Sequence, residues 1–246
     1  MSANRRAVLA LAGLSTLVAA TPAGAASPKS SLPVKPTLRI DPRELGAAGD
    51  GLAKDTHAIQ LALDRCAVFG GGEVVLAGGT FLTGAIRIGA NTILRIEEGA
   101  TLQGSPDLAD YPIVQVRWEG RWVPGYIGLV WAQGARNIVI TGKGAIVAAE
   151  AIKGRVQKET GLRHPALLEF VDVQGLVVAD LKTQQNDMWS IHPVYCDDVV
   201  FHNLVVNGRA DGIDVDSCRR VVIDRCDFDT VDDCISLKSG RAWRAI

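Results

Sequence analysis

Two aspartate-bearing segments recur at a fixed spacing near the end of the chain, and this repeat limits the possible folds more than any other feature. Asp211 and Asp233 lie 22 residues apart, and so do Ile213 and Ile235. A repeat of this length is typical of a solenoid, in which each repeat forms one coil. Equivalent residues then stack on neighbouring coils, about 4.8 Å apart if the coils pair as parallel strands. The repeat therefore predicts that Asp211 and the pair Asp232 and Asp233 converge on one surface.

Short apolar runs separated by turn residues make up most of the chain after residue 72, as in a β-rich protein. Leu176, Val199 and Val221 are spaced 23 and 22 residues apart, which extends the repeat backwards along the chain. Because no helical stretches separate the runs, alternating β/α units are excluded. We predict an all-β fold, a right-handed parallel β-helix. The expected strands are Glu73–Leu76, Ala85–Ile88, Thr92–Ile96, Asn137–Ile140, Leu167–Val171, Leu176–Val178, Val199–Phe201, Val221–Ile223 and Ile235–Leu237.

One α-helix is expected before the strands, over Asp55–Ala67, with Asp55 as its N-cap and the glycine run 70–72 at its end. Its apolar face consists of Ile59, Ala62, Leu63 and Cys66. We expect this helix to cap the N-terminal end of the solenoid, where open strand edges would otherwise pair with other chains. Two long loops are expected, at residues 105–130 and 148–165.

The start of the chain has the features of a signal peptide. Arg5 and Arg6 precede an apolar run over residues 7–20, and small residues stand before Ala26. A twin-arginine signal and an ordinary secretory signal both fit this pattern. The expected segments are a signal peptide at 1–25, a linker at 26–37 and the β-helix domain at 38–246.

Charge and composition exclude some partners. The chain has 26 basic and 27 acidic residues, and cleavage of the leader would remove two arginines, leaving a small acidic excess. This balance does not suit nucleic-acid binding. The leader's apolar run is too short for a good membrane span, so we expect a periplasmic or secreted protein with no membrane association after cleavage. No Cys-x-x-Cys or His-rich cluster indicates a metal site, and none is expected.

The five cysteines are an odd number for an exported chain. Cys196 and Cys218 share the 22-residue spacing, so they are expected to stack inside the solenoid. They could be small buried apolar residues or a disulfide. Cys234 has no evident partner.

The aspartates can do acid–base chemistry if they meet. Like charges at short distance raise the pKa of at least one carboxyl, and this is how an acid and a base arise from one residue type. The alternative for any single aspartate is a turn residue bonded to its own backbone. The recurrence of Asp211 and Asp233 in register favours a shared site.

Further segments resemble a known family. These are Gly46–Gly51, Lys54–Gln60, Gly70–Val75, Glu98–Leu102, Asp110–Pro112, Ile140–Gly144 and Trp189–Val194. With the aspartate segments, they resemble the pectin-degrading β-helix enzymes and, among these, glycoside hydrolase family 28, the polygalacturonases. The resemblance implies inverting hydrolysis of pectin or galacturonan, with Asp232 as general acid and Asp211 and Asp233 positioning water. It also implies no cofactor, and a monomer for the full-length protein.

The chain departs from the family pattern at three places. Arg209-Ala210 replaces Asn-Thr before the first aspartate, and Val231 replaces a glycine before the aspartate pair. The family's later Gly-His-Gly and Arg-x-Lys segments, the second of which holds the substrate carboxylate, do not occur before Ile246. We therefore expect a C-terminally truncated relative that is inactive alone, with its last coil exposed at Ile235 and Leu237.

The candidate substrate-binding residues are Trp189, His192, Asp214, Lys238, Arg117 and Trp118. Trp189 shares a column with Asp211 and Asp233, and it either supports a sugar ring or packs in the core. His192, expected beside Asp214, either joins the site or makes a structural hydrogen bond.

The remaining candidates also have two interpretations. Lys238 either binds a uronate carboxylate or forms a surface ion pair with Asp216, one period earlier. Arg117 and Trp118, in the first long loop, could form one wall of a groove for an acidic sugar chain, or a satellite cluster under the loop. Arg121, Trp122 and Tyr126 would complete the wall.

Three other functions stay open. The departures from the family pattern leave room for activity on decorated or rhamnose-containing pectin. A pectate-lyase-type enzyme would need calcium, which the aspartates could bind, and a basic residue to abstract a proton, for which no arginine is placed. A non-catalytic carbohydrate-binding β-helix would keep the groove without the chemistry.

Overall fold

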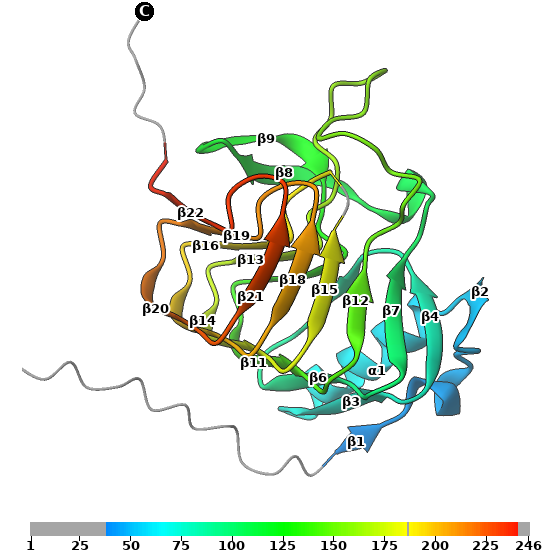
Figure 1. Cartoon of the computed structure of the whole chain (residues 1–246). Helices are drawn as coiled ribbons and strands as arrows, with labels where there is room; N and C mark the ends of the chain where they lie inside the picture. Colours follow the sequence, from blue (N-terminus) through cyan, green and yellow to red (C-terminus); the bar gives the residue numbers. More distant parts are fainter. Residues whose placement is uncertain (1–37, 186, 241–246) are drawn as a thin grey trace, which may run out of the picture.

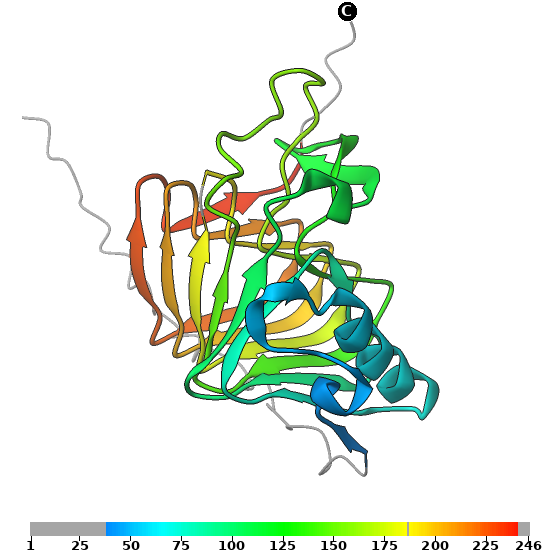
Figure 2. The same cartoon turned by 90° about the vertical axis from the view of Figure 1, so that its right-hand side faces the viewer.

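Parallel strands wind into a solenoid of stacked coils in the computed structural model, which describes residues 38–185 and 187–240 (Figure 1). The predicted signal peptide and linker lie outside the described residues. Each complete coil contributes one strand to each of three parallel sheets. The prediction of a right-handed parallel β-helix is confirmed, and Figure 2 shows the sheets surrounding a common interior.

The first sheet contains β1 (Arg39–Ile40), β3 (Gly72–Leu76), β6 (Thr92–Ile96), β11 (Arg136–Thr141), β14 (Gln174–Ala179), β17 (Asp197–His202) and β20 (Arg219–Asp224). The second contains β5 (Ile86–Arg87), β10 (Val130–Gln133), β13 (Leu168–Val171), β16 (Ile191–Val194), β19 (Ile213–Asp216) and β22 (Ile235–Lys238). The third contains β2 (Asp50–Lys54), β4 (Gly79–Thr83), β7 (Ala100–Gly104), β12 (Ala145–Val147), β15 (Lys182–Gln185), β18 (Val205–Gly208) and β21 (Asp227–Thr230).

The register of the strands confirms the stacking expected from the repeat. Ile213 pairs with Ile235 across β19 and β22. Cys196 lies next to Cys218, and its backbone N–H donates to the Sγ of Cys218 at 3.3 Å. Both are free thiols, so they pack as small side chains in the interior.

Equivalent side chains fill the interior in columns. Leu94, Ile140, Val178 and Phe201 pair in successive strands of the first sheet, and all four are fully buried. Because inward positions repeat once per coil, each coil places an apolar residue on the one before it. Burying such a side chain stabilises the fold by roughly 1.5–3 kcal/mol.

The coils turn at residues with left-handed backbone conformation. Asp172, Tyr195 and Ser217 occupy equivalent corners after β13, β16 and β19, with φ of 53°, 53° and 57°. Asp tolerates this region because its side chain can bond to the nearby backbone, whereas Tyr195 is a less common choice. The repeated corner keeps successive strands parallel.

Helix α1 (Thr56–Val68) follows the short 3-10 helix η1 (Pro42–Leu45) and packs against β3, β5 and β6 (Figure 2). The expected apolar face is buried: Ile59, Ala62, Leu63 and Cys66. Asp55 is the N-cap residue, as predicted, but its side chain makes no capping hydrogen bond. Its carboxylate instead accepts the backbone N–H groups of Ala48 and Gly49, at 2.6 and 3.0 Å. That the helix serves as the cap of the solenoid stays a prediction.

The first long loop contains an antiparallel hairpin that we did not expect. It consists of β8 (Ile113–Trp118) and β9 (Arg121–Tyr126) and follows the 3-10 helix η2 (Leu108–Asp110). Figure 1 shows the hairpin above β13 and β16, close to the strands that carry the aspartates. The second loop, residues 148–165, lies beside the hairpin, since Gly125 forms an isolated bridge with Arg163.

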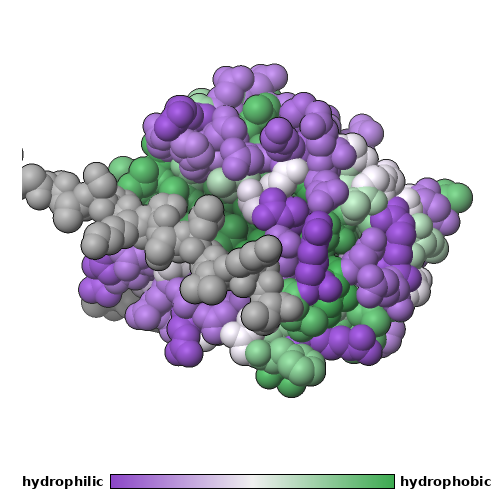
Figure 3. Space-filling view, turned by 90° about the horizontal axis from the view of Figure 1, so that it is seen from below, coloured by the Kyte–Doolittle hydropathy of each residue, from purple (hydrophilic) through white to green (hydrophobic). Residues whose placement is uncertain are grey.

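The last described coil is exposed, as predicted: Ile235 is 42% and Leu237 81% accessible. On a different face, seen from below the view of Figure 1, hydrophilic and hydrophobic residues are interspersed (Figure 3). Within 38–185 and 187–240, no helix is long and apolar enough to span a membrane.

Candidate active site

The aspartates meet at the N-terminal ends of β19 and β22. Asp211 precedes β19, and Asp232 and Asp233 precede β22. The coils are joined there by the hydrogen bond from the N–H of Gly212 to the carbonyl of Asp233, at 2.9 Å. Asp211 is nearly buried at 6% accessibility, whereas Asp232 and Asp233 are exposed. One site thus has a shielded and an accessible carboxylate.

Arg155, from the second long loop, bridges two of these acids. Its Nη2 lies 2.5 Å from Oδ2 of Asp232 and 3.8 Å from Oδ1 of Asp211. Because both distances start from the same nitrogen, these two oxygens lie no farther apart than the sum of the two lengths. This upper limit on the distance between the two oxygens is slightly below the separation of about 6.5–9.5 Å between the two carboxyl groups in inverting glycosidases.

Asp214 lies on β19, the strand that follows Asp211, and it is less accessible to solvent than Asp211. It is fully buried, and its Oδ1 accepts a short hydrogen bond from the Nζ of Lys238, while its Oδ2 has no hydrogen-bond partner among the described residues. Burial raises the pKa of Asp214 to about 8; Lys238 opposes this shift and Asp211 adds to it. Asp214 is therefore a carboxyl that can hold a proton near neutral pH.

Lys238 contacts the buried acids, not the expected partner. The predicted ion pair with Asp216 is wrong, because the Lys238 side chain reaches Asp214 and lies 3.4 Å from Oδ2 of Asp211. Its Nζ also lies 3.7 Å from the centroid of the Trp189 ring. Backbone register pairs Lys238 with Asp216, but the lysine side chain is long enough to reach along the strand towards two carboxylates.

Trp189 and His192 are both fully buried. Their rings pack edge to face with centroids 4.7 Å apart, and Nδ1 of His192 lies 3.4 Å from Oε1 of Glu169. Burial lowers the pKa of His192. Contact of these two side chains with substrate stays a prediction, and their burial favours a supporting role.

Glu169 and Arg163 form a buried ion pair beneath the site. Nη2 of Arg163 donates to both carboxylate oxygens of Glu169, at 2.9 and 2.8 Å, and the N–H of Gly128 adds a third hydrogen bond. Burial alone would raise the pKa of Glu169, but Arg163 and His192 hold that pKa below its ordinary value. The pair joins the end of the second loop to strand β13.

The hairpin contributes Arg117 and Trp118. Nε of Arg117 lies 2.9 Å from Oδ2 of Asp216, with both side chains almost entirely buried. Burial would raise the pKa of Asp216, but hydrogen bonds from Arg117 and Ser217 lower it. Trp118 is partly buried and packs against Met188, Trp189 and Ala210. Their role in substrate binding stays a prediction, and their contacts favour holding the hairpin against the coil.

Sequence reasoning missed three residues of this site: Arg155, Glu169 and Arg163. Glu169 pairs with His192 in the register of β13 and β16, so the repeat could have identified it. Arg155 and Arg163 lie in a segment without the repeat, and no spacing signal marks them.

The calcium alternative has little support from the acids. Lys238 contacts Asp214 and Asp211, Arg155 contacts Asp232 and Asp211, and Arg117 contacts Asp216. Four of the five proposed ligands therefore already have cationic partners. Nothing in 38–185 and 187–240 groups three or more metal-ligating side chains.

The fold and the site define the class of protein: a parallel β-helix with a candidate acid–base site of aspartates on stacked coils. Within this class, the chain belongs to glycosyl hydrolases family 28, whose sequence profile matches residues 79–244. It is 24% identical over 216 residues to a probable polygalacturonase of Vitis vinifera, covering 80% of this chain and 43% of that protein. It is 24% identical over 255 residues to an exo-poly-α-D-galacturonosidase of Dickeya chrysanthemi, with coverage of 82% and 42%.

Solved structures show the same fold. An exopolygalacturonase from Thermotoga maritima superposes with a TM-score of 0.74 at 26% identity, covering 85% of this chain and 56% of that one. A family 28 exopolygalacturonase from Yersinia enterocolitica gives 0.70 at 22% identity, with coverage of 83% and 45%. The chain spans less than half the length of the curated relatives from Vitis vinifera and Dickeya chrysanthemi.

Proposed function

We propose that the site of this chain serves to hydrolyse glycosidic bonds in a pectin-type polysaccharide such as galacturonan, in a protein of the length of its relatives. That the 246-residue chain is inactive alone stays a prediction. The observation that carries the proposal is the pair Asp211 and Asp232, brought to one nitrogen of Arg155 from two adjacent coils. Family membership and the polygalacturonase relatives support the same substrate class.

The proposed roles follow from exposure. Asp232, which is exposed, protonates the leaving oxygen as general acid. Asp211, which is shielded, positions the attacking water together with Asp233. Inversion requires room for this water between the carboxylates, so we expect their separation to increase when substrate displaces Arg155.

Reducing-sugar release from polygalacturonate by a full-length version of the protein tests the proposal, with Asp232→Asn as the control variant. The amide has nearly the same shape but cannot give up a proton, so activity should fall by roughly 10²–10⁴-fold or more. NMR of the first product should show the inverted anomer. Wild-type protein that neither binds nor cleaves galacturonan would contradict the substrate class.

The same assay separates the rival functions. A lyase would yield unsaturated product and lose activity with a chelator. A non-catalytic binding protein would retain affinity in both proteins without turnover. Activity only on rhamnose-containing pectin would keep the chemistry and change the substrate.

Export to the periplasm or the medium is part of the proposal, based on Arg5, Arg6 and the apolar run that follows. N-terminal sequencing of exported protein should start near Ala26. Replacing both arginines with lysine should block export only if the twin-arginine route is used.

A further inference from the structure

The acidic site needs a positive group if its substrate is a uronate. Asp211, Asp232 and Asp233 lie together, and a galacturonate unit would add a carboxylate beside them. Like charges at this distance repel, so binding requires a cation that faces the substrate and can leave its own partner.

Most of the cations around the site are already committed. Lys238 is 17% accessible and contacts Asp214 and Asp211. Arg117 and Arg163 are 8% and 0% accessible and form buried pairs with Asp216 and Glu169. Removing one partner of such a buried pair costs about 3–5 kcal/mol, so these cations are unsuited to exchange.

Arg155 differs from them in exposure. Its side chain is 40% accessible, and that of its partner Asp232 is 49% accessible. An ion pair exposed to this extent contributes at most about 1 kcal/mol. A substrate carboxylate can therefore replace Asp232 as the partner of Arg155 at small cost, and the exchange leaves Asp232 free to act on the glycosidic oxygen.

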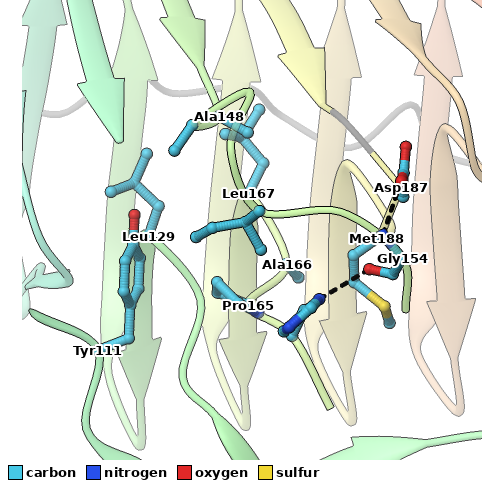
Figure 4. A pocket seen from close by; sticks show the side chains of 12 residues that line it. Tyr111, Leu129, Ala148, Gly154, Pro165, Ala166, Leu167, Asp187 and Met188 are labelled. Carbon is cyan, nitrogen blue, oxygen red and sulfur yellow. Dashed lines mark hydrogen bonds between the residues drawn. The ribbon is translucent and has the colours of Figure 1, made fainter. Parts of the chain in front are cut away.

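The loop holds Arg155 in place through its neighbour Gly154. The N–H of Gly154 donates to Oδ2 of Asp187 at 2.6 Å, and its carbonyl bonds to Nδ1 of His164 at 2.8 Å (Figure 4). A pocket lies beneath this point, lined by Gly154, Asp187 and mainly apolar residues such as Met188. Two hydrogen bonds thus fix the backbone of the residue before Arg155.

Asp187 is fixed in turn by Arg209, whose Nε lies 3.0 Å from its Oδ1. Arg209 is the residue at which the sequence departs from the family pattern before the first aspartate. Its side chain is 52% accessible and that of Asp187 is 25% accessible. The departure thereby contributes an anchor for the segment that carries Arg155.

We propose that Arg155 is a specificity-determining residue that binds the substrate's uronate carboxylate, exchanging onto it from Asp232, and that Arg209 positions it through Asp187. This inference rests on the proposed function. The planar guanidinium suits it to the task, because it can bind a carboxylate with two parallel hydrogen bonds.

The proposal is tested by measuring the binding of two matched ligands, a galacturonate trimer and its fully methyl-esterified, neutral form. Each ligand is titrated into the 246-residue chain, and its affinity is measured by calorimetry. Arg155→Gln should weaken binding of the acid trimer roughly 10- to 100-fold, the range of one charge-assisted hydrogen bond, and leave the ester nearly unchanged. Arg155→Lys should recover part of the loss. Arg209→Gln should give a smaller loss for the acid trimer only.

Lys153→Gln is the matched control. It removes the same charge as Arg155→Gln from the same loop, and within the described residues Lys153 forms an ion pair with Glu150 and not with the acids of the site. It should bind both ligands as wild type does. Circular dichroism should show each variant folded.

The possible failures are distinguishable. If wild type binds the acid trimer and Arg155→Gln binds it equally well, the inference is overturned and the proposed function stands. Tighter binding by Arg155→Gln would also overturn it, since Arg155 would then compete with substrate. If wild type binds neither trimer, the inference and the proposed substrate class both fail.

Discussion

The Nε atom of Arg117 lies 2.9 Å from a carboxylate oxygen of Asp216, although the two residues are 99 positions apart in the sequence. Their side chains are only 8% and 1% accessible. The guanidinium also lies 5.7 Å from the ring centroid of Trp122 and 5.4 Å from that of Tyr195. This one pair therefore joins the hairpin to the coil that carries the first aspartate.

Loss of Arg117 should destabilise the protein strongly. In Arg117→Met, the carboxylate of Asp216 stays buried with only Ser217 as a side-chain partner, and removing one partner of a buried pair costs about 3–5 kcal/mol. Urea denaturation should show this loss. Arg225→Met is the control, because Arg225 is 75% accessible and pairs with Asp224 at the surface; it should cost at most about 1 kcal/mol. Equal losses in both variants would contradict the anchoring role.

The columns of the interior predict a second stability difference. Phe201 is fully buried between Val178 and Ile223, so Phe201→Ala should cost about 3–5 kcal/mol through lost burial and the cavity left behind. Phe69→Ala removes the same atoms from a residue that is 76% accessible, and it should change stability by about 0.5 kcal/mol or less. Denaturation midpoints of the two variants provide the measurement. A small effect at Phe201 would mean that neighbouring coils collapse into the cavity.

The sequence predicted strands of two of the three sheets, although not all of them, and no strand of the third. Strands such as β17 contain apolar runs, and every expected strand overlaps an observed one in the first or second sheet. Strands of the third sheet are often polar, as in Lys182–Gln185 and Asp227–Thr230. Their pairing depends on the coils beside them, so no local apolar pattern marks them. The hairpin was missed for a related reason, since Pro124 and Gly125 interrupt its second strand.

The acids of the site could be predicted because they belong to the repeat, and their partners could not. Stacking one period apart brings Asp211 and Asp233 to one place in any parallel solenoid. Arg155 reaches Asp232 from a segment outside the repeat, 77 residues away. Lys238 was assigned to Asp216 by backbone register, but side-chain reach and burial determine its actual partners.

The pH dependence of stability should contain a contribution from Asp214. Its pKa in the folded protein is about 8 because it is buried, against about 3.9 for an exposed aspartate. Between these values the folded state holds a proton that the unfolded chain lacks, so the free energy of unfolding falls as pH rises from about 4 to 8. Asp214→Asn should flatten the slope of stability against pH across this window.

Asp216→Asn is the control for this measurement, because the folded protein shifts the pKa of Asp216 in the opposite direction to that of Asp214. Its folded pKa is lowered, so the stability it contributes is present above the unfolded value and lost only as pH falls below about 4. This variant should keep the slope between pH 4 and 8. An unchanged slope in Asp214→Asn would show that Asp214 is ionised in the folded protein.

Lys238 provides the last test, because two interpretations of it predict different losses. Its ammonium contacts Asp214 and Asp211 and lies on the face of the Trp189 ring. Lys238→Met should therefore leave Asp214 without a cation, whereas Asp211 keeps Arg155 at 3.8 Å. Above pH 8, where Asp214 is ionised, we expect a loss of about 3 kcal/mol, at the lower end of the range for buried pairs, since Lys238 is 17% accessible. The loss should be smaller at neutral pH, where Asp214 holds a proton. Adding Asp214→Asn should restore part of it, because the two residues are coupled. If Lys238→Met were as stable as wild type but bound a galacturonate trimer more weakly, Lys238 would be a substrate ligand and its contacts with the acids would be secondary.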